Sequence, residues 1–228
     1  MTIYRCGVFN RRPGLSDQAF RSHWIDVHGA LAKKLPGLGS YRQNHILERL
    51  YEASDSPVQT IDGISQLSFE SVAHMVTSDA SPEYAACKED IPKFQGSITV
   101  LVLESDEILP KQGSGETPAK LVWVSTRRDG QASEGLRRRW LEANKDAARD
   151  VPGARRFVQN FVTDRGHAVK TAAQSGDPSG AETVSELWFD DAAQLKTAVA
   201  SEAGRKLLHD GSMLRPVGIY LMEEVRIV

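Results

Sequence analysis

The chain has 228 residues, of which 40% are hydrophobic and 25% charged, and its formal net charge is −2. This composition is typical of a folded globular protein, and the small charge gives no reason to expect binding to nucleic acid or an anionic membrane. No apolar run reaches the roughly 18 residues that span a bilayer. The N-terminus has no secretory pattern, and Cys6 and Cys87 show neither metal-ligand nor disulfide spacing. We therefore expect a cytoplasmic protein.

The first half of the chain predicts the order strand, helix, strand, strand, helix, strand. Apolar side chains alternate over residues 2–9, and a Pro-Gly turn leads to Ser16, a favourable helix N-cap. Apolar residues then recur at helical spacing until Pro36-Gly37 ends the helix. The remaining predicted elements are strands at 40–48 and 61–69, helical material at 71–91 and a strand at 97–105.

The second half repeats this order at an offset of 116 residues, which places Trp24 opposite Trp140. The predicted elements are strands at 119–127, 155–164, 182–189 and 217–227, with helices at 132–150 and 191–209. The Gly, Pro and Ser residues near the end of segment 165–180 predict a long loop there, which is either a flap or a plain insertion. Each half is thus a βαββαβ unit.

The repeat predicts an α+β fold of two ferredoxin-like units, at 1–105 and 119–228, joined by a linker at 106–118. Each unit would have helices on one face of an antiparallel sheet, so the two bare faces would pack together or curl into a shared barrel. The interior of that barrel is the expected cavity. A monomer suffices if one chain closes the barrel, whereas a homodimer is needed if each half pairs with a neighbour's half.

Alternation along the strands assigns side chains to the two sheet faces. We expect Val122 and Val124 to pack under the helices, which leaves Leu121 and Trp123 for the barrel cavity. The residues that we expect to face this cavity are, by the same reasoning and the repeat, Arg5, Gly7, Phe9, Tyr41, Gln43, His45, Gln66, Ser68, Glu186 and Trp188.

Several segments of the first half together resemble the EthD family of the dimeric α/β-barrel superfamily. They are the run Arg11-Arg12-Pro13-Gly14-Leu15-Ser16, the helical residues Phe20, Trp24 and His28, the turn Pro36-Gly37 with residues 41–44, and the stretch 63–70. The resemblance covers most of 1–105, and a weaker copy covers 119–228. It implies a superfamily that includes muconolactone-type isomerases, polyketide dehydratases and cyclases, cofactor-free monooxygenases and haem-degrading relatives.

The resemblance also implies a catalytic pair. In the methylmuconolactone isomerase branch, a His late in the first helix and a Tyr on the next strand are similar in place to His28 and Tyr41. The second half departs from this pattern, because Asn144 and Phe157 stand at the matching positions. Asn can keep a structural hydrogen bond but cannot carry a proton at neutral pH, so a single site in the first half is expected.

The candidate residues also have structural interpretations. An imidazole at His28 could titrate near neutrality and move a proton, but it could equally be a packing histidine bonded to backbone. Tyr41 could donate to a developing oxyanion, or place its hydroxyl at the barrel rim. Arg5 would need a partner if buried, and a structural pair with Glu186 is the simpler expectation.

These observations predict a cofactor-independent lyase or isomerase for a small hydrophobic, oxygenated ring compound. We expect His28 and Tyr41 to be catalytic and the substrate to contact Arg5, Phe9, Trp24, Gln43, His45, Trp123, Glu186 and Trp188. No nucleotide-binding, phosphate-binding or metal-binding motif is present in the sequence, so we expect no cofactor and no metal. The alternatives are an EthD-type oxidoreductase or cofactor-free monooxygenase, and a non-catalytic ligand-binding protein.

Overall fold

The protein is described by a computed structural model, which covers residues 2–56, 58, 60–113, 115, 119–165, 180–209 and 212–228. The loop expected at 165–180 lies almost entirely outside the described residues. Within the described part of the chain, no helix is long and apolar enough to cross a membrane.

The first half has the predicted element order. Its elements are β1 (Ile3–Arg11), α1 (Asp17–Ser22), the π-helical turn η1 (His23–His28), α2 (Gly29–Ala32), β2 (Ser40–Glu52), β3 (Gly63–Phe69), α3 (Val72–Asp79), α4 (Pro82–Phe94) and β4 (Gln95–Leu109). The expected N-cap is confirmed, because the Ser16 side chain accepts a hydrogen bond from the backbone N–H of Ala19. Strand β4 extends to Leu109, into the segment expected as linker.

The second half repeats these elements with small departures. They are β5 (Ala119–Arg127), α5 (Leu136–Asn144), the 3-10 turn η2 (Ala147–Asp150), β6 (Arg156–Asp164), β7 (Thr183–Phe189), α6 (Ala192–Ala200), α7 (Glu202–His209) and β8 (Leu214–Arg226). The helix predicted over 132–150 is shorter, since α5 ends at Asn144 and a separate turn follows.

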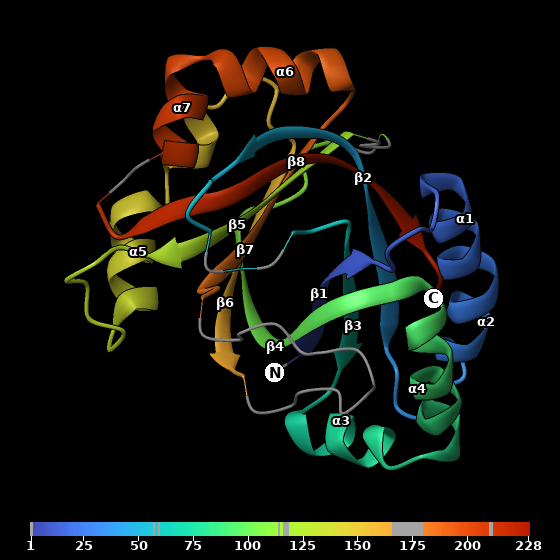
Figure 1. The fold of residues 1–228 in the computed structure, drawn as a ribbon. Helices are drawn as coiled ribbons and strands as arrows, with labels where there is room; N and C mark the ends of the chain where they lie inside the picture. Colours follow the sequence, from blue (N-terminus) through green and yellow to red (C-terminus); the bar gives the residue numbers. More distant parts are fainter. Residues whose placement is uncertain are drawn as a thin grey trace.

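One chain closes a barrel of eight antiparallel strands in the order β1-β3-β2-β8-β5-β7-β6-β4. The two halves meet along two seams, where β2 pairs with β8 and β4 pairs with β6. The long strands β2 and β4 supply these seams because both extend beyond the edges of their own four-stranded sheets. Figure 1 shows α1, α2 and α4 grouped on one side of the barrel and α5, α6 and α7 on another. No second chain is needed to complete the barrel.

The barrel interior is filled by side chains, which corrects the expected assignment of strand faces. A cluster of buried residues drawn from strands of both halves, and from no helix, includes Cys6, Val8, Ile64, Val122, Val124 and Met222. Leu121 and Trp123 instead pack with Trp140 of α5 beneath the helices. The prediction was therefore wrong for β1 and β5, since Phe9 and Trp123 lie under the helices and their strand neighbours Val8 and Val122 face the barrel interior.

The face assignment was also wrong for β2 but right for β3 and β7. The Tyr41 hydroxyl reaches Trp24 in η1, so Tyr41 and Gln43 face the helices. Leu187 and Phe189 pack under the helices as predicted. Their neighbour Glu186 faces the barrel interior, also as predicted.

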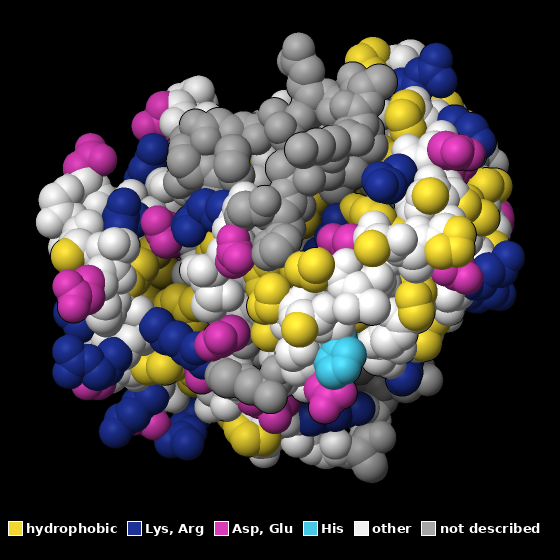
Figure 2. Space-filling view, turned by 90° about the horizontal axis from the view of Figure 1, so that it is seen from below, with side chains coloured by type: hydrophobic (Ala, Val, Ile, Leu, Met, Phe, Trp, Pro, Cys, Tyr) yellow, Lys and Arg dark blue, Asp and Glu magenta, His cyan; other side chains and the backbone are white. Residues whose placement is uncertain are grey.

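Charged side chains of both signs are distributed over the surface. Figure 2 shows Lys and Arg intermingled with Asp and Glu on the face seen from below. On this face the mixture leaves no extended area of one charge sign.

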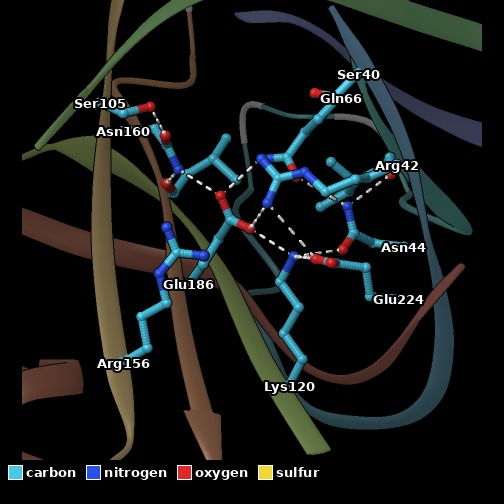
Figure 3. A network of polar contacts seen from close by, with 12 residues as sticks. Ser40, Arg42, Asn44, Gln66, Ser105, Lys120, Arg156, Asn160, Glu186 and Glu224 are labelled. Atoms are coloured by element: carbon cyan, nitrogen blue, oxygen red, sulfur yellow. Dashed lines mark hydrogen bonds and ion pairs between the residues drawn. The ribbon is translucent and has the colours of Figure 1, made fainter. Parts of the chain in front are cut away.

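A polar network inside the barrel links the two halves. Asn44 donates to the carbonyl of Ile64 and to Gln66, and Asn160 donates in the same way to Val184 and Glu186. Gln66 Nε2 then donates to Glu186 Oε1 across 2.7 Å, between the repeats. Figure 3 shows Glu186 at the centre of these contacts.

The charge of Glu186 is neutralised inside this network. Lys120 Nζ lies 2.5 Å from Glu186 Oε2, and both side chains are 1% exposed. Burial alone would raise the pKa of Glu186, but Lys120 and Arg42 lower it to about 2. Lys120 also contacts Asn44 and Glu224, so the ion pair belongs to a wider set of polar contacts.

We expect Lys120→Met to lower the free energy of unfolding by about 3–5 kcal/mol, because it leaves the Glu186 carboxylate buried without its closest cation. Urea unfolding at pH 7 measures this loss. Since the folded pKa of Glu186 lies below its ordinary 4.5, its contribution is present above pH 4.5 and is lost as the pH falls toward 2. Glu186→Gln should flatten the acid part of the stability curve; unchanged curves for both variants would contradict the assigned role of the pair.

Candidate functional site

The candidate site is a cavity of about 50 Å³ between the first-half sheet and its helices, not inside the barrel as predicted. Residues from η1, α2 and α4 form one wall, and residues from the four strands form the other. A cavity of this size holds a few water molecules. A cavity that binds benzene measures about 150 Å³, so a ring-shaped ligand enters only if the lining side chains move apart. The predicted site residues that line it are Arg5, Trp24, His28 and Tyr41.

A π-helical turn positions Trp24 and His28 on the cavity. The backbone N–H of Gly29 bonds to the carbonyl of Trp24, five residues earlier. Gln43 Nε2 donates to the same carbonyl across 2.8 Å and so anchors the turn to β2. Such π-turns are rare and often occur at functional sites. Here the widened turn holds both the indole and the imidazole in buried positions.

His28 is held by a buried carboxylate that the sequence analysis missed. Its Nδ1 lies 3.1 Å from Asp90 Oδ2, and His23 Nε2 lies 3.0 Å from Asp90 Oδ1. Burial would raise the pKa of Asp90, which is 1% exposed, but the hydrogen bonds from His28 and His23 lower it to about 2. The ionised carboxylate favours a proton on His28 Nδ1, because an acceptor fixes the tautomer of the ring that faces it.

The tautomer leaves His28 Nε2 with a free lone pair. No described residue forms a hydrogen bond with Nε2, and the His28 ring lines the cavity. The ring packs against Phe94 with centroids 4.8 Å apart, which restricts its rotation. His28 is therefore paired with Asp90 and not with a backbone group, and its free nitrogen lies on the side of the ring away from the carboxylate.

One sequence signal could have identified Asp90. It lies on the same face of α4 as the buried residues Cys87, Ile91 and Phe94. A carboxylate on an apolar helix stripe requires a partner. The partner itself could not be read from the sequence, because it depends on how α4 packs against η1.

Tyr41 presents a neutral hydroxyl. Its oxygen accepts hydrogen bonds from Trp24 Nε1 across 2.9 Å and from Gln43 Nε2 across 3.1 Å. Burial raises the pKa of Tyr41 well above its usual value, so the group is a hydrogen-bond donor and not a base. With both bonds accepted at the oxygen, the hydroxyl proton remains available for a ligand oxygen.

Arg5 is buried beside the cavity, but its expected partner was wrong. Its Nη1 lies 2.5 Å from Asp79 Oδ1, its Nη2 donates to the Tyr84 hydroxyl, and the guanidinium lies over the Tyr84 ring. Glu186 instead pairs with Lys120 in the barrel interior. The two residues face opposite sides of the sheet, so they cannot meet.

Two further predicted residues support the indole of Trp24. The rings of Phe9 and His45 lie with centroids 4.8 Å and 4.3 Å from the Trp24 ring. Burial lowers the pKa of His45 to about 3, and its Nε2 bonds to Gln43 Oε1 across 3.0 Å. His45 is thus a neutral packing residue at pH 7.

The second half does not contribute the predicted residues to this cavity. Trp123 and Phe157 stack on each other under the second set of helices, with ring centroids 5.6 Å apart. Trp188 lies beside Lys120, and Glu186 belongs to the barrel network. None of these residues lines the cavity of the first half.

The residues at two aligned positions of the repeat explain why only the first half has this cavity. Gly7 of the cavity corresponds to Trp123, which fills the equivalent space with an indole ring. Asn144, at the position of His28, donates to the carbonyl of Trp140 within its own helix. The second copy therefore keeps the architecture but has a packed core where the first has a cavity.

Among the described residues, no group of three or more His, Cys, Asp or Glu side chains could hold a metal ion. Cys87 lines the cavity, but burial and the nearby Asp90 raise the pKa of its thiol to about 11. The thiol is therefore protonated at pH 7 and is a poor nucleophile.

The fold and the repeated helix-strand pattern define a tandem α/β-barrel protein. A family model described as the EthD domain matches residues 12–97 and 128–213, which together exceed half of the chain. The protein belongs to the EthD family, with two copies of the domain in one chain. No curated protein matches it.

Solved structures show that the whole chain shares its fold with other proteins. An anthrone oxidase-like protein is 12% identical, with a TM-score of 0.62 over 99% of this chain and 93% of its own. A protein from Lactobacillus acidophilus NCFM, provisionally named a monooxygenase, is 11% identical, with a TM-score of 0.51 over 100% and 94%. A chlorite dismutase variant from Candidatus Nitrospira defluvii is 9% identical, with a TM-score of 0.55 over 99% and 92%.

Proposed function

We propose that the first half carries a cofactor-independent active site that moves a proton on a small oxygenated ring compound. The observation that carries this proposal is the Asp90-His28 pair, whose free nitrogen belongs to a ring on a cavity also lined by Tyr41. A general base and an oxygen-binding donor on one mostly apolar cavity are what an isomerase or dehydratase requires.

The residues support a simple sequence of steps. His28 Nε2 removes a proton from the carbon next to a ring carbonyl, and the electron pair of that C–H bond moves to the carbonyl oxygen. The Tyr41 hydroxyl donates to this enolate oxygen, and Asp90 stabilises the imidazolium that has formed. The imidazolium then returns the proton to another ring carbon, or gives it to a departing hydroxyl as water.

The proposal predicts that His28→Asn lowers turnover by about 10²–10⁴-fold, because Asn cannot carry the proton. NMR of 2-cyclohexenone or a γ-butenolide in D₂O measures exchange of the ring C–H with solvent. Asn144→Ala, which alters the matching position of the second half without burying a charge, serves as the control and should leave exchange unchanged. If the His28→Asn variant folds and retains wild-type exchange, the assignment of His28 as the base is wrong.

A cofactor-free oxygenase is the second candidate. The same base would ionise a phenol, and the electron-rich anion would react with O₂. The likeness in fold to an anthrone oxidase-like protein favours this candidate. Oxygen uptake with and without a phenol panel distinguishes it, because an isomerase or dehydratase consumes no O₂.

A non-catalytic ligand-binding protein is the third possibility. It would be favoured if ligands stabilise the wild type, His28→Asn and Tyr41→Phe equally in thermal unfolding and no product forms.

A further inference from the structure

Two buried hydrogen-bond donors converge on the Tyr41 hydroxyl. Trp24 Nε1 lies 2.9 Å and Gln43 Nε2 lies 3.1 Å from the phenolic oxygen, and all three side chains are at most 1% exposed. A hydroxyl oxygen has two acceptor positions and one proton, so these two bonds occupy both acceptor positions. The proton of Tyr41 is therefore left for a third group.

The amide of Gln43 is held at both ends in the orientation that makes it a donor to Tyr41. Its Nε2 also donates to the Trp24 carbonyl across 2.8 Å, and a carbonyl oxygen can only accept. Its Oε1 lies 3.0 Å from His45 Nε2. Burial lowers the pKa of His45 to about 3, so the ring is neutral at pH 7 and directs its one proton from Nε2 to the amide oxygen. A reversed amide would lose the bonds to both Trp24 and His45.

The second half contains the same glutamine and indole without this network. Gln159 and Trp140 stand at the matching positions, but Phe157 replaces the tyrosine. Gln159 Nε2 is buried with no partner among the described residues, and the Trp140 carbonyl accepts from Asn144 instead. Because the second half folds into the same βαββαβ order, the network around Tyr41 is not a requirement of the architecture.

Hydrogen bonds accepted by a hydroxyl oxygen strengthen the bond that its proton donates. Each accepted bond polarises the O–H group and stabilises negative charge that develops on the oxygen. Burial raises the pKa of Tyr41, whereas the bonds from Trp24 and Gln43 oppose that rise. The two donors therefore make Tyr41 a stronger hydrogen-bond donor than burial alone would leave it.

We propose that Gln43, together with Trp24, is a positioning residue that aims the Tyr41 hydroxyl and strengthens it as a donor to the substrate oxygen. Gln43 is not among the residues that line the cavity, so it acts through Tyr41 and does not touch the substrate. The enolate of the proposed reaction carries its charge on that oxygen, so the effect is larger in the transition state than in the bound substrate. The inference rests on the proposed function for the reaction, but the acidity of the Tyr41 hydroxyl can be measured without any ligand.

The first test measures this acidity with a difluorotyrosine in place of Tyr41, because fluorination brings the ionisation of the phenol into a range that fluorine NMR can follow by pH titration. We expect Gln43→Met to lower the acid dissociation constant of the label by about 10–100-fold, since the phenolate loses a donor. Gln159→Met is the matched control and should leave it unchanged, because Gln159 is equally buried at the matching position of the second half. Trp24→Phe removes the other donor and should also lower the constant, which keeps the test decisive if Gln43→Met does not fold.

The second test asks whether Gln43 acts through Tyr41 during turnover. In the C–H exchange assay, Gln43→Met should lower kcat by about 10-fold with KM nearly unchanged, because the donated bond strengthens as charge develops on the substrate. In a Tyr41→Phe background the same change should cause no further loss of kcat. Gln159→Met again serves as the control.

Three results would overturn the inference. An unchanged dissociation constant in folded Gln43→Met or Trp24→Phe protein would show that these groups do not support the phenolate. An equal shift in Gln159→Met would make the effect a general one, and additive losses of kcat in Gln43→Met and Tyr41→Phe would show that Gln43 acts by another route. If the wild type exchanges no C–H groups while the acidity changes as expected, the proposed reaction fails and the role of Gln43 at Tyr41 stands.

Discussion

Asp90→Asn should lower turnover by about 10²–10⁴-fold while the protein stays folded. The carboxylate orients His28 and stabilises the imidazolium formed when His28 takes up a proton. An amide can donate to Nδ1 and so favours the wrong tautomer, with the proton on Nε2, where it blocks the base. Exchange of ring C–H groups in D₂O measures the effect.

A control at a second histidine distinguishes loss of orientation at His28 from a general loss of structure. His23→Asn is the control, because His23 contacts the same carboxylate from outside the cavity lining. A wild-type exchange rate in a folded Asp90→Asn protein would contradict the role assigned to the carboxylate.

Gly7→Trp should abolish ligand binding and turnover together. A Cβ at Gly7 would lie 2.6 Å from Ser65 Oγ and 3.3 Å from Ile98 Cδ1, so even a small side chain enters occupied space. Trp is the residue that the second half has at this position. An indole there would fill the cavity, as Trp123 does against Phe157.

Calorimetry with phenol and the exchange assay measure this effect, and Gly7→Ala provides a milder variant in case Gly7→Trp does not fold. The reverse change, Trp123→Gly, should cost about 3–5 kcal/mol of stability because it empties a packed core. That variant should also bind small apolar rings in the second half without catalysing exchange, since Asn144 and Phe157 lack the required groups. Tight phenol binding by a folded Gly7→Trp protein would place the ligand site elsewhere.

The repeat made most of the architecture predictable from the sequence. Two aligned copies with Trp24 and Trp140 in register indicated the βαββαβ order, and the N-cap at Ser16 fixed the start of the first helix. The π-helical turn was not foreseen, because apolar spacing over 20–31 is compatible with a regular helix. Its geometry depends on the bond from Gln43 to the Trp24 carbonyl, which is a tertiary contact.

The candidate site was predicted in part. His28, Tyr41, Trp24 and Arg5 do line one cavity, although the expected location in the barrel interior was wrong. The error arose because Val122 and Trp123 are both apolar, so alternation separates the two strand faces without showing which one the helices cover. Asp90 was missed because its significance depends on burial and partners that only the folded chain defines.

The contact between Gln66 and Glu186 requires two different residues at matching positions of the repeat. These residues occupy matching places in the two repeats and meet inside the barrel. A symmetric homodimer of single units would have to place the same residue at both positions, and two facing carboxylates would repel each other. Joining the copies in one polypeptide removes that constraint, so each half can change independently. The first half can then keep its cavity while core side chains fill the matching space of the second half.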